Sequence, residues 1–168
     1  TVGDNIPDTD DWAEYWDSIF SPFADWIQTS FPHMHDTASP VRRELVNKHG
    51  LLYTWPGSDP TLKPIVLMSH QDVVPVANET LDQWIHPPFS GHIDIENQTV
   101  WGRGSVDCKL WLVSTISAVE TLVKSDFKPK RTIILSIGHD EESDGKHGAQ
   151  HLSAELEKRF GRGGIGMI

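Results

Sequence analysis

Two largely apolar runs, residues 64–69 and 131–137, constrain the fold of this 168-residue chain most strongly. Neither run alternates strictly between apolar and polar residues, and such continuity is typical of strands that are buried on both faces. Between the two runs, residues 109–123 place their apolar side chains at helical spacing. Strands that alternate with helices predict an α/β fold with three layers, αβα, around a mostly parallel central sheet.

Local signals outline the remaining elements of this fold. A helix is expected over 11–29, broken at Pro22, and a second helix should open at Ser39-Pro40 and end near Asn47, because a serine cap followed by proline begins many helices. Short strands are predicted at 51–55, 92–95 and 100–101, a further helix at 149–160, and the start of another strand near Ile165.

Composition excludes several classes of protein. The length suits one domain with a hydrophobic core of its own. The formal net charge of −10 argues against binding to nucleic acid, which needs clustered lysine and arginine. A single cysteine, Cys108, excludes an intrachain disulfide. No apolar run approaches the roughly 20 residues of a membrane-spanning helix, and the sequence does not begin with a basic and then apolar leader.

Acidic residues and histidines cluster where the predicted strands end. His70-Gln71-Asp72 follows the run 64–69, Asp107 follows the strand at 100–101, and His139-Asp140-Glu141-Glu142 follows the run 131–137. In α/β sheets, ligands bind beyond the carboxyl ends of the strands. We therefore expect the three clusters to converge at one edge of one sheet.

Each cluster alone has an ordinary explanation. A His-x-Asp triplet arises by chance, Asp107 suits the cap of the following helix, and an acidic loop before a helix is favoured by the helix dipole. Together, however, the carboxylates would repel one another at a cost of several kcal/mol unless a cation lay among them. Imidazole and carboxylate ligands without a thiolate suit zinc, and a free coordination position suits catalysis.

Four segments resemble a known family. The segments "MSHQDVVPV", "WIHPPFSGHI", "VWGRGSVDCK" and "KPKRTIILSIGHDEES" are similar to carboxypeptidases of the co-catalytic zinc family that also contains aminoacylase and succinyl-diaminopimelate desuccinylase. The resemblance extends from about residue 51 to about residue 160. It implies a zinc-dependent carboxypeptidase that hydrolyses the C-terminal peptide bond of short peptides of the Gly-X type.

The resemblance also implies a role for five residues. His70, Asp107 and Glu142 would be metal ligands, with Asp107 bridging two zinc ions. Asp72 would orient the ligating histidine, and Glu141 would be the general base that deprotonates the attacking water. The family further implies a cis peptide bond after Asp107.

Matching the family pattern predicts an incomplete domain. Residues 1–50 would form an N-terminal helical segment of the catalytic domain, and 51–168 its first part, with the remaining zinc ligands beyond residue 168 and the lid or dimerisation domain absent. Such a chain is expected to be inactive alone, and a homodimer is expected only of the full-length form. The pair Leu110-Trp111 departs from the family pattern, and the tryptophan would either crowd the metals or repack against the sheet.

Other functions stay open at this stage. The chain could be a non-catalytic remnant or a metal-binding module, or it could belong to an aminoacylase-type hydrolase of N-acyl amino acids, because the ligand set is shared across the family. Two Asn-x-Thr sequons, at Asn78 and Asn97, are either glycosylation acceptors or chance matches in polar loops. The sequons and the resemblance favour a vacuolar or secretory location. A short peptide with a free C-terminus would be the substrate.

Overall fold

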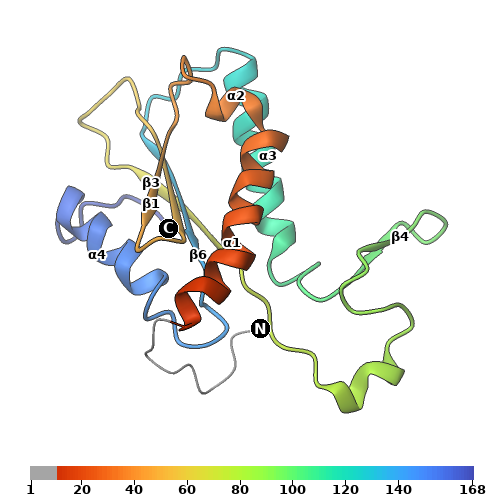
Figure 1. Ribbon diagram of the computed structural model, residues 1–168. Helices are drawn as coiled ribbons and strands as arrows, with labels where there is room; N and C mark the ends of the chain where they lie inside the picture. The colour runs from red at the N-terminus through yellow and green to blue at the C-terminus, as the bar shows by residue number, and fades with distance from the viewer. Residues whose placement is uncertain (1–10) are drawn as a thin grey trace.

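A computed structural model describes residues 11–168 of the chain, and its side chains from Glu14 onward (Figure 1). The elements follow one another as α1 (Asp11–Ser30), α2 (Pro32–His35), β1 (Arg42–Val46), β2 (Gly50–Trp55), β3 (Ile65–His70), a 3-10 helix η1 (Asn78–Gln83), β4 (His92–Asp94), β5 (Thr99–Trp101), α3 (Lys109–Lys124), β6 (Ile133–Gly138) and α4 (Ala149–Phe160).

The central sheet has four strands in the order β1-β2-β6-β3. Strands β3 and β6 are parallel, whereas β2 is antiparallel to both β1 and β6. The α/β class is therefore confirmed, but the predicted mostly parallel sheet is wrong for the described residues, where the sheet is mixed. The reason is local: Asn47 and Lys48 adopt positive φ angles of 47° and 69° in a tight turn, which folds β1 back against β2.

Helices cover both faces of the sheet, so the three-layer architecture is confirmed. Helices α1 and α3 lie together on one side of the sheet and α4 on the other (Figure 1). Along β2, the side chains of Leu51, Tyr53 and Trp55 join the core beneath α1, α2 and α3, whereas Leu52 joins the core beneath α4. This alternation is the two-residue period of a strand between two layers.

Two predictions about the N-terminal region were wrong. Helix α1 continues through Pro22 instead of breaking there, and it anchors itself by burying Trp16, Phe20 and Ile27. The expected helix ending near Asn47 is instead strand β1, which pairs along its whole length with β2. A local cap signal carries no information about such a long-range partner, and pairing overrides it. The N-terminal segment 1–50 is thus only partly helical where it is described. Residues 1–10 lie outside the described part, and the predicted domain boundaries stay a prediction.

Strand β3 also differs from its prediction. It was expected to be buried on both faces, yet Leu67 and Met68 are 38% and 57% exposed. In the described part of the chain β3 pairs only with β6, apart from an isolated parallel bridge between Ile65 and Met167. The strand is therefore an edge strand, with the predicted strand near Ile165 represented by this one bridge.

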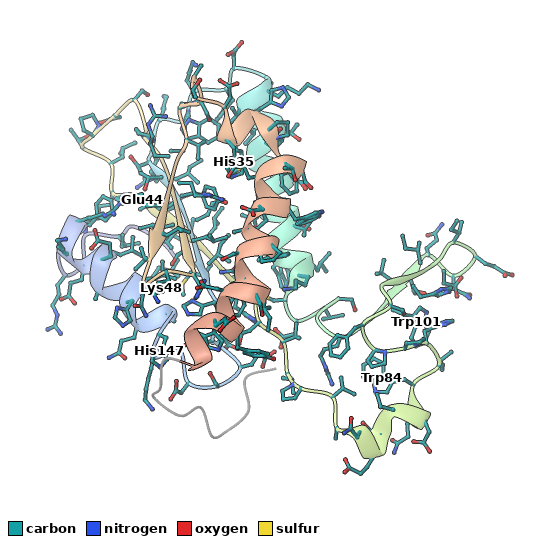
Figure 2. The ribbon with its side chains drawn as sticks, in the orientation of Figure 1. His35, Glu44, Lys48, Trp84, Trp101 and His147 are labelled. Atoms are coloured by element: carbon teal, nitrogen blue, oxygen red, sulfur yellow. The ribbon has the colours of Figure 1, made fainter. Side chains whose placement is uncertain are left out.

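An arm formed by residues 77–101 extends from the body of the molecule (Figure 2). It contains η1 and the two-stranded sheet of β4 and β5, which is separate from the central sheet. Trp84 and Trp101, both on the arm, lie away from α1 and the central sheet. Strand β5 therefore does not place Asp107 at the sheet edge, as we had expected, and the placement depends on the start of α3 instead.

Candidate metal centre

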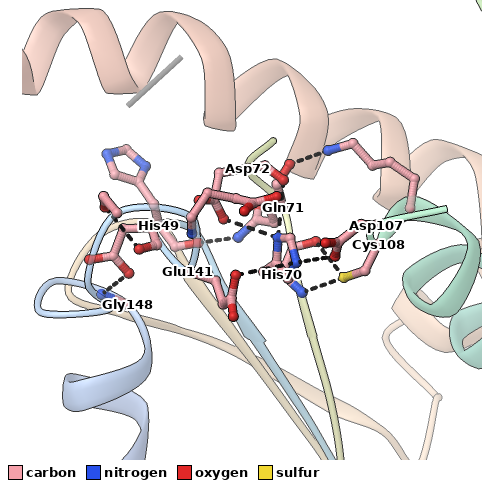
Figure 3. A network of polar contacts seen from close by, with 12 residues as sticks. His49, His70, Gln71, Asp72, Asp107, Cys108, Glu141 and Gly148 are labelled. Carbon is pink, nitrogen blue, oxygen red and sulfur yellow. Dashed lines mark hydrogen bonds and ion pairs between the residues drawn. The ribbon is translucent and has the colours of Figure 1, made fainter. Parts of the chain in front are cut away.

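The predicted site lies at the carboxyl ends of two adjacent parallel strands. Because β3 and β6 run side by side and pair His70 with Gly138, the segments that follow them emerge at the same edge of the sheet. Asp107 reaches that edge from the turn before α3. The structure thus brings His70, Asp107 and Glu141 together (Figure 3).

His70 is the centre of this arrangement. Its imidazole is largely buried, with Nδ1 at 3.0 Å from the Asp72 carbonyl oxygen and 3.3 Å from Asp72 Oδ1. On the other side of the ring, Nε2 lies 3.0 Å from Asp107 Oδ1 and 3.7 Å from Glu141 Oε2. The hydrogen bond with Asp72 raises the pKa of His70 to about 9, with a further contribution from Asp107. Below this pKa, Nε2 therefore carries a proton at the position where a metal ion would bind.

Asp72 holds two parts of the site at once. One of its carboxylate oxygens faces His70 Nδ1, and the other, Oδ2, accepts a hydrogen bond of 2.9 Å from the backbone N–H of Glu142. Burial alone would raise the pKa of this carboxyl, but the hydrogen bonds from His70 and Glu142 hold it below its usual range. Asp72 is therefore a buried anion that orients the histidine, as a supporting carboxylate does at many metal sites.

The remaining carboxylates are accessible from solvent. The side chains of Asp107 and Glu141 are 71% and 58% exposed. Burial raises the pKa of Glu142, and the negative charges of Asp107 and Glu141 raise it further. Ligand atoms of His70, Glu141 and Glu142 lie within 4.8 Å of one another, as do those of His70, Asp107 and Cys108. Such a group of negative charges favours a cation.

Cys108 and Lys109 connect the start of α3 to the end of β3. The Cys108 thiol accepts a hydrogen bond of 3.1 Å from the backbone N–H of His70, and burial raises its pKa, which disfavours the thiolate form that binds metals. The Lys109 ammonium group donates to the Gln71 carbonyl oxygen. The peptide bond between Asp107 and Cys108 is cis, as the family resemblance predicted.

Two residues near the site have roles that sequence reasoning did not resolve. His139 was counted with the acidic cluster, yet its fully buried ring packs edge-on against Trp16 and Phe20, and burial lowers its pKa to about 4. It is a neutral packing residue. Trp111 is 63% exposed and lines a cavity of about 310 Å³ with His70 and Glu141, so it has not repacked against the sheet.

Sequence reasoning missed one residue altogether. Asp140 was named in the acidic cluster but given no role of its own, yet its side chain is fully buried and accepts hydrogen bonds from the backbone before α4. The signal that could have revealed it is Gly148, a glycine directly before the helix, where a buried carboxylate can approach the backbone closely.

Comparison with known protein families agrees with this geometry. The profile of peptidase family M20/M25/M40 matches residues 66–167, which is more than half of the chain and contains all five residues of the predicted site. The chain belongs to this family. The family includes metallo-carboxypeptidases, so metal use and hydrolysis are properties found in the family to which the chain belongs.

Two relatives illustrate the range of the family. Carboxypeptidase S of Saccharomyces cerevisiae is 48% identical over 98% of this chain and 28% of its own length. The N-fatty-acyl-amino acid synthase/hydrolase PM20D1 of Mus musculus is 41% identical over 84% of this chain and 27% of its own length. The chain therefore spans little more than a quarter of each of these relatives.

Solved structures support the fold. The M20 family metallo-carboxypeptidase Sso-CP2 from Sulfolobus solfataricus superposes with a TM-score of 0.57 and 20% identity, over 85% of this chain and 30% of that chain. At this level of identity the likeness concerns the fold alone. The roles assigned to His70, Asp72, Asp107, Glu141 and Glu142 stay predictions, which the observed gathering of these side chains supports.

Proposed function

We propose that the chain is part of a zinc-dependent carboxypeptidase whose metals bind at the carboxyl ends of β3 and β6. One observation carries the proposal: the imidazole of His70 presents Nε2 to Asp107 and Glu141 while Asp72 occupies Nδ1. A histidine whose second nitrogen is held by a carboxylate is prepared to bind a metal through the first.

The residues present fit zinc. They offer one imidazole nitrogen and several carboxylate oxygens, a set of ligand atoms that zinc accepts at catalytic sites. His70, Asp107 and Glu142 would hold the ions, with Asp107 shared between two. Three protein ligands are too few for two ions, so we predict that the remaining ligands lie beyond residue 168. When bound, zinc polarises the scissile carbonyl and lowers the pKa of the attacking water.

Glu141 is the residue we assign to proton transfer. Its carboxylate is 58% exposed and lies 3.7 Å from His70 Nε2, so it can reach both the ligand cluster and a substrate. An oxygen of Glu141 would accept a proton as the oxygen of water bonds to the scissile carbon. The same oxygen would return the proton to the nitrogen of the leaving amino acid as the carbon–nitrogen bond breaks.

Substrates are proposed on similarity. The relation to carboxypeptidase S favours peptides with a free C-terminus, and the resemblance of the four sequence segments implies short peptides of the Gly-X type. A second candidate, hydrolysis of N-acyl amino acids, is favoured by the relation to the N-fatty-acyl-amino acid synthase/hydrolase. Both reactions break an amide bond beside an amino acid, so the site residues serve either. Parallel assays of the complete natural protein on an N-blocked Gly-Leu dipeptide and on an N-oleoyl amino acid would separate them, and hydrolysis of neither would favour a non-catalytic metal-binding module.

Location and assembly are further proposals. Among residues 11–168 we find no helix with the length and apolar character needed to cross a membrane. Asn78 and Asn97 are both exposed on the arm, so both sequons are accessible for glycosylation. A vacuolar or secretory location, and a homodimer of the full-length form, remain predictions.

The Glu141→Gln substitution tests the proposed function. Because glutamine has nearly the same shape and cannot accept the proton, we expect kcat of the complete natural protein to fall by about 10²- to 10⁴-fold. Zinc content, measured by atomic emission, should stay at the wild-type value. The Glu79→Gln variant changes an exposed glutamate on the arm in the same way and should leave both quantities unchanged. Loss of zinc together with activity in Glu141→Gln would make Glu141 a ligand and contradict the proposal.

A further inference from the structure

We propose that Asp140 is a positioning residue that fixes Glu141 and Glu142 at the metal centre. This inference rests on the proposed function, because it concerns the loop that carries the proposed base and ligand. Asp140 touches neither metal nor substrate in this proposal. It acts by fixing the backbone from which the next two side chains project.

The Asp140 side chain is anchored to the segment that precedes α4. Its relative exposure is 0%, and its Oδ1 and Oδ2 accept hydrogen bonds from the backbone N–H groups of Gly148 and His147, at 2.8 and 2.6 Å. Hydrogen bonds from backbone N–H groups to a carboxylate are among the strong ones, and the positive end of a helix adds to them. A buried charge with such partners is held firmly in one place.

The backbone of Asp140 closes the loop. Its carbonyl oxygen accepts hydrogen bonds from the N–H groups of Ser143, Asp144 and Gly145, at 3.2, 3.3 and 2.9 Å. Asp140 thus holds the turn 141–145 through its carbonyl oxygen and the segment 147–148 through its side chain. Glu141 and Glu142 lie directly inside this turn, so their backbone positions follow from those of Asp140.

Gly148 makes the contact possible. A Cβ atom at this position would lie 2.4 Å from Asp140 Oδ1 and 2.8 Å from the backbone nitrogen of His139. No side chain fits at that distance, so the carboxylate and the backbone approach closely only because residue 148 is glycine.

The loop is also held from the opposite side. The backbone N–H of Glu142 donates to Asp72 Oδ2, and Asp72 in turn holds His70. Glu141 and Glu142 therefore lie between two buried aspartates, Asp140, bonded to the segment before α4, and Asp72, paired with His70. A displacement of about 1 Å at a catalytic group is enough to lower turnover severely. The proposed clamp limits such displacement.

The test is the Asp140→Asn variant of the complete natural protein, with Asp144→Asn as matched control. Asp144 lies in the same loop, but its carboxylate is at the surface beside Lys146. Asparagine keeps the shape of Asp140 and loses its charge, and its amide NH₂ faces a backbone N–H. We expect kcat on an N-blocked Gly-Leu dipeptide to fall about 10- to 100-fold with KM within about twofold, and the zinc Kd, measured by chelator competition, to rise about tenfold. Asp144→Asn should match the wild type in all three.

If the role of Asp140 were only structural, its substitution would lower the melting temperature and leave kcat and the zinc Kd unchanged. If Asp140→Asn lowers only the melting temperature, while the folded protein keeps wild-type kcat and zinc Kd, the inference is overturned and the proposed function stands. If Asp140→Asn does not fold, Gly148→Ala disturbs the same contact from the other side and must show the same loss of kcat and zinc affinity. Failure of both variants to fold would also overturn the inference. If the wild-type protein neither binds zinc nor hydrolyses its substrates, the proposed function itself fails.

Discussion

The site has a floor and a rim, and they use the same chemical group differently. The floor consists of Asp72 and Asp140, which are 5% and 0% exposed and bonded to backbone N–H groups. The rim consists of Asp107 and Glu141, whose side chains are 71% and 58% exposed. The floor carboxylates find their partners within the protein, whereas those of the rim face His70 and solvent. The same carboxylate group therefore has two kinds of surroundings here: when buried it holds the loops, and when exposed it is accessible to a cation or a substrate.

The largest effect is expected at the rim. In Asp107→Asn the proposed bridging carboxylate loses its charge, so we expect kcat of the complete natural protein to fall by about 10³-fold or more, together with loss of zinc. Because the side chain is exposed, the melting temperature of the metal-free protein should change by no more than about 2 °C. Kinetics, zinc content and calorimetry on one preparation would measure all three. A large drop in the melting temperature of the metal-free protein would mean that Asp107 stabilises the fold as the floor carboxylates do, and would contradict this prediction.

A floor substitution should affect both folding and metal binding. In Asp72→Asn the buried group loses its ion pair with His70 and the charge-assisted hydrogen bond from the Glu142 N–H, so we expect the free energy of unfolding to fall by about 1–3 kcal/mol. Zinc affinity should also fall, by about 10- to 100-fold. Denaturant unfolding and chelator competition measure the two effects.

Asp94→Asn is the control for the floor. Asp94 also accepts hydrogen bonds from a backbone N–H and an amide, those of Asn97, but in the exposed turn of the arm. Its substitution should leave zinc affinity unchanged. Equal losses of zinc affinity in Asp72→Asn and Asp94→Asn would mean that a buried floor carboxylate matters no more for zinc binding than an exposed carboxylate on the arm.

The smallest single step, up to about tenfold in zinc affinity for each pH unit, concerns the proton on His70 between floor and rim. The pKa of His70 is raised to about 9, so below that pH its Nε2 carries a proton that zinc must displace. Zinc affinity should therefore decrease as pH falls, by up to about tenfold for each pH unit from this proton alone, and level off above about pH 9. Competition titrations between pH 6 and 10 would show this slope. An affinity independent of pH over this range would mean that His70 is not protonated in the metal-free protein.

Much of the sheet and its helices could be predicted because their signals are local. The apolar runs that became β3 and β6, and the helical spacing of α3, indicated both the elements and the edge where their ends meet. Strand β1 could not be predicted in this way. Its partner is β2, and the Ser39-Pro40 pair that suggested a helix says nothing about that pairing.

The location of the site could be predicted from the sequence, but the directions of its side chains could not. His70, Asp107 and Glu141 were expected at one sheet edge, and the structure brings them together. What the pattern of residue types could not reveal is which way each side chain points. His139 and Asp140 turn into the protein whereas Glu141 turns outward, although the three are consecutive. The burial of Asp140 depends on Gly148, whereas that of His139 depends on Trp16 and Phe20 of α1, which are distant in sequence.

The central claim is that His70, Asp107 and Glu142 hold zinc at the carboxyl ends of β3 and β6. Anomalous diffraction at the zinc edge, from crystals of the complete natural protein grown with zinc, tests it most directly. We expect strong peaks within bonding distance of His70 Nε2 and of carboxylate oxygens of Asp107 and Glu142, with Glu141 beside them and unbound. Zinc peaks located elsewhere, with the His70 Nε2 position empty, would contradict it.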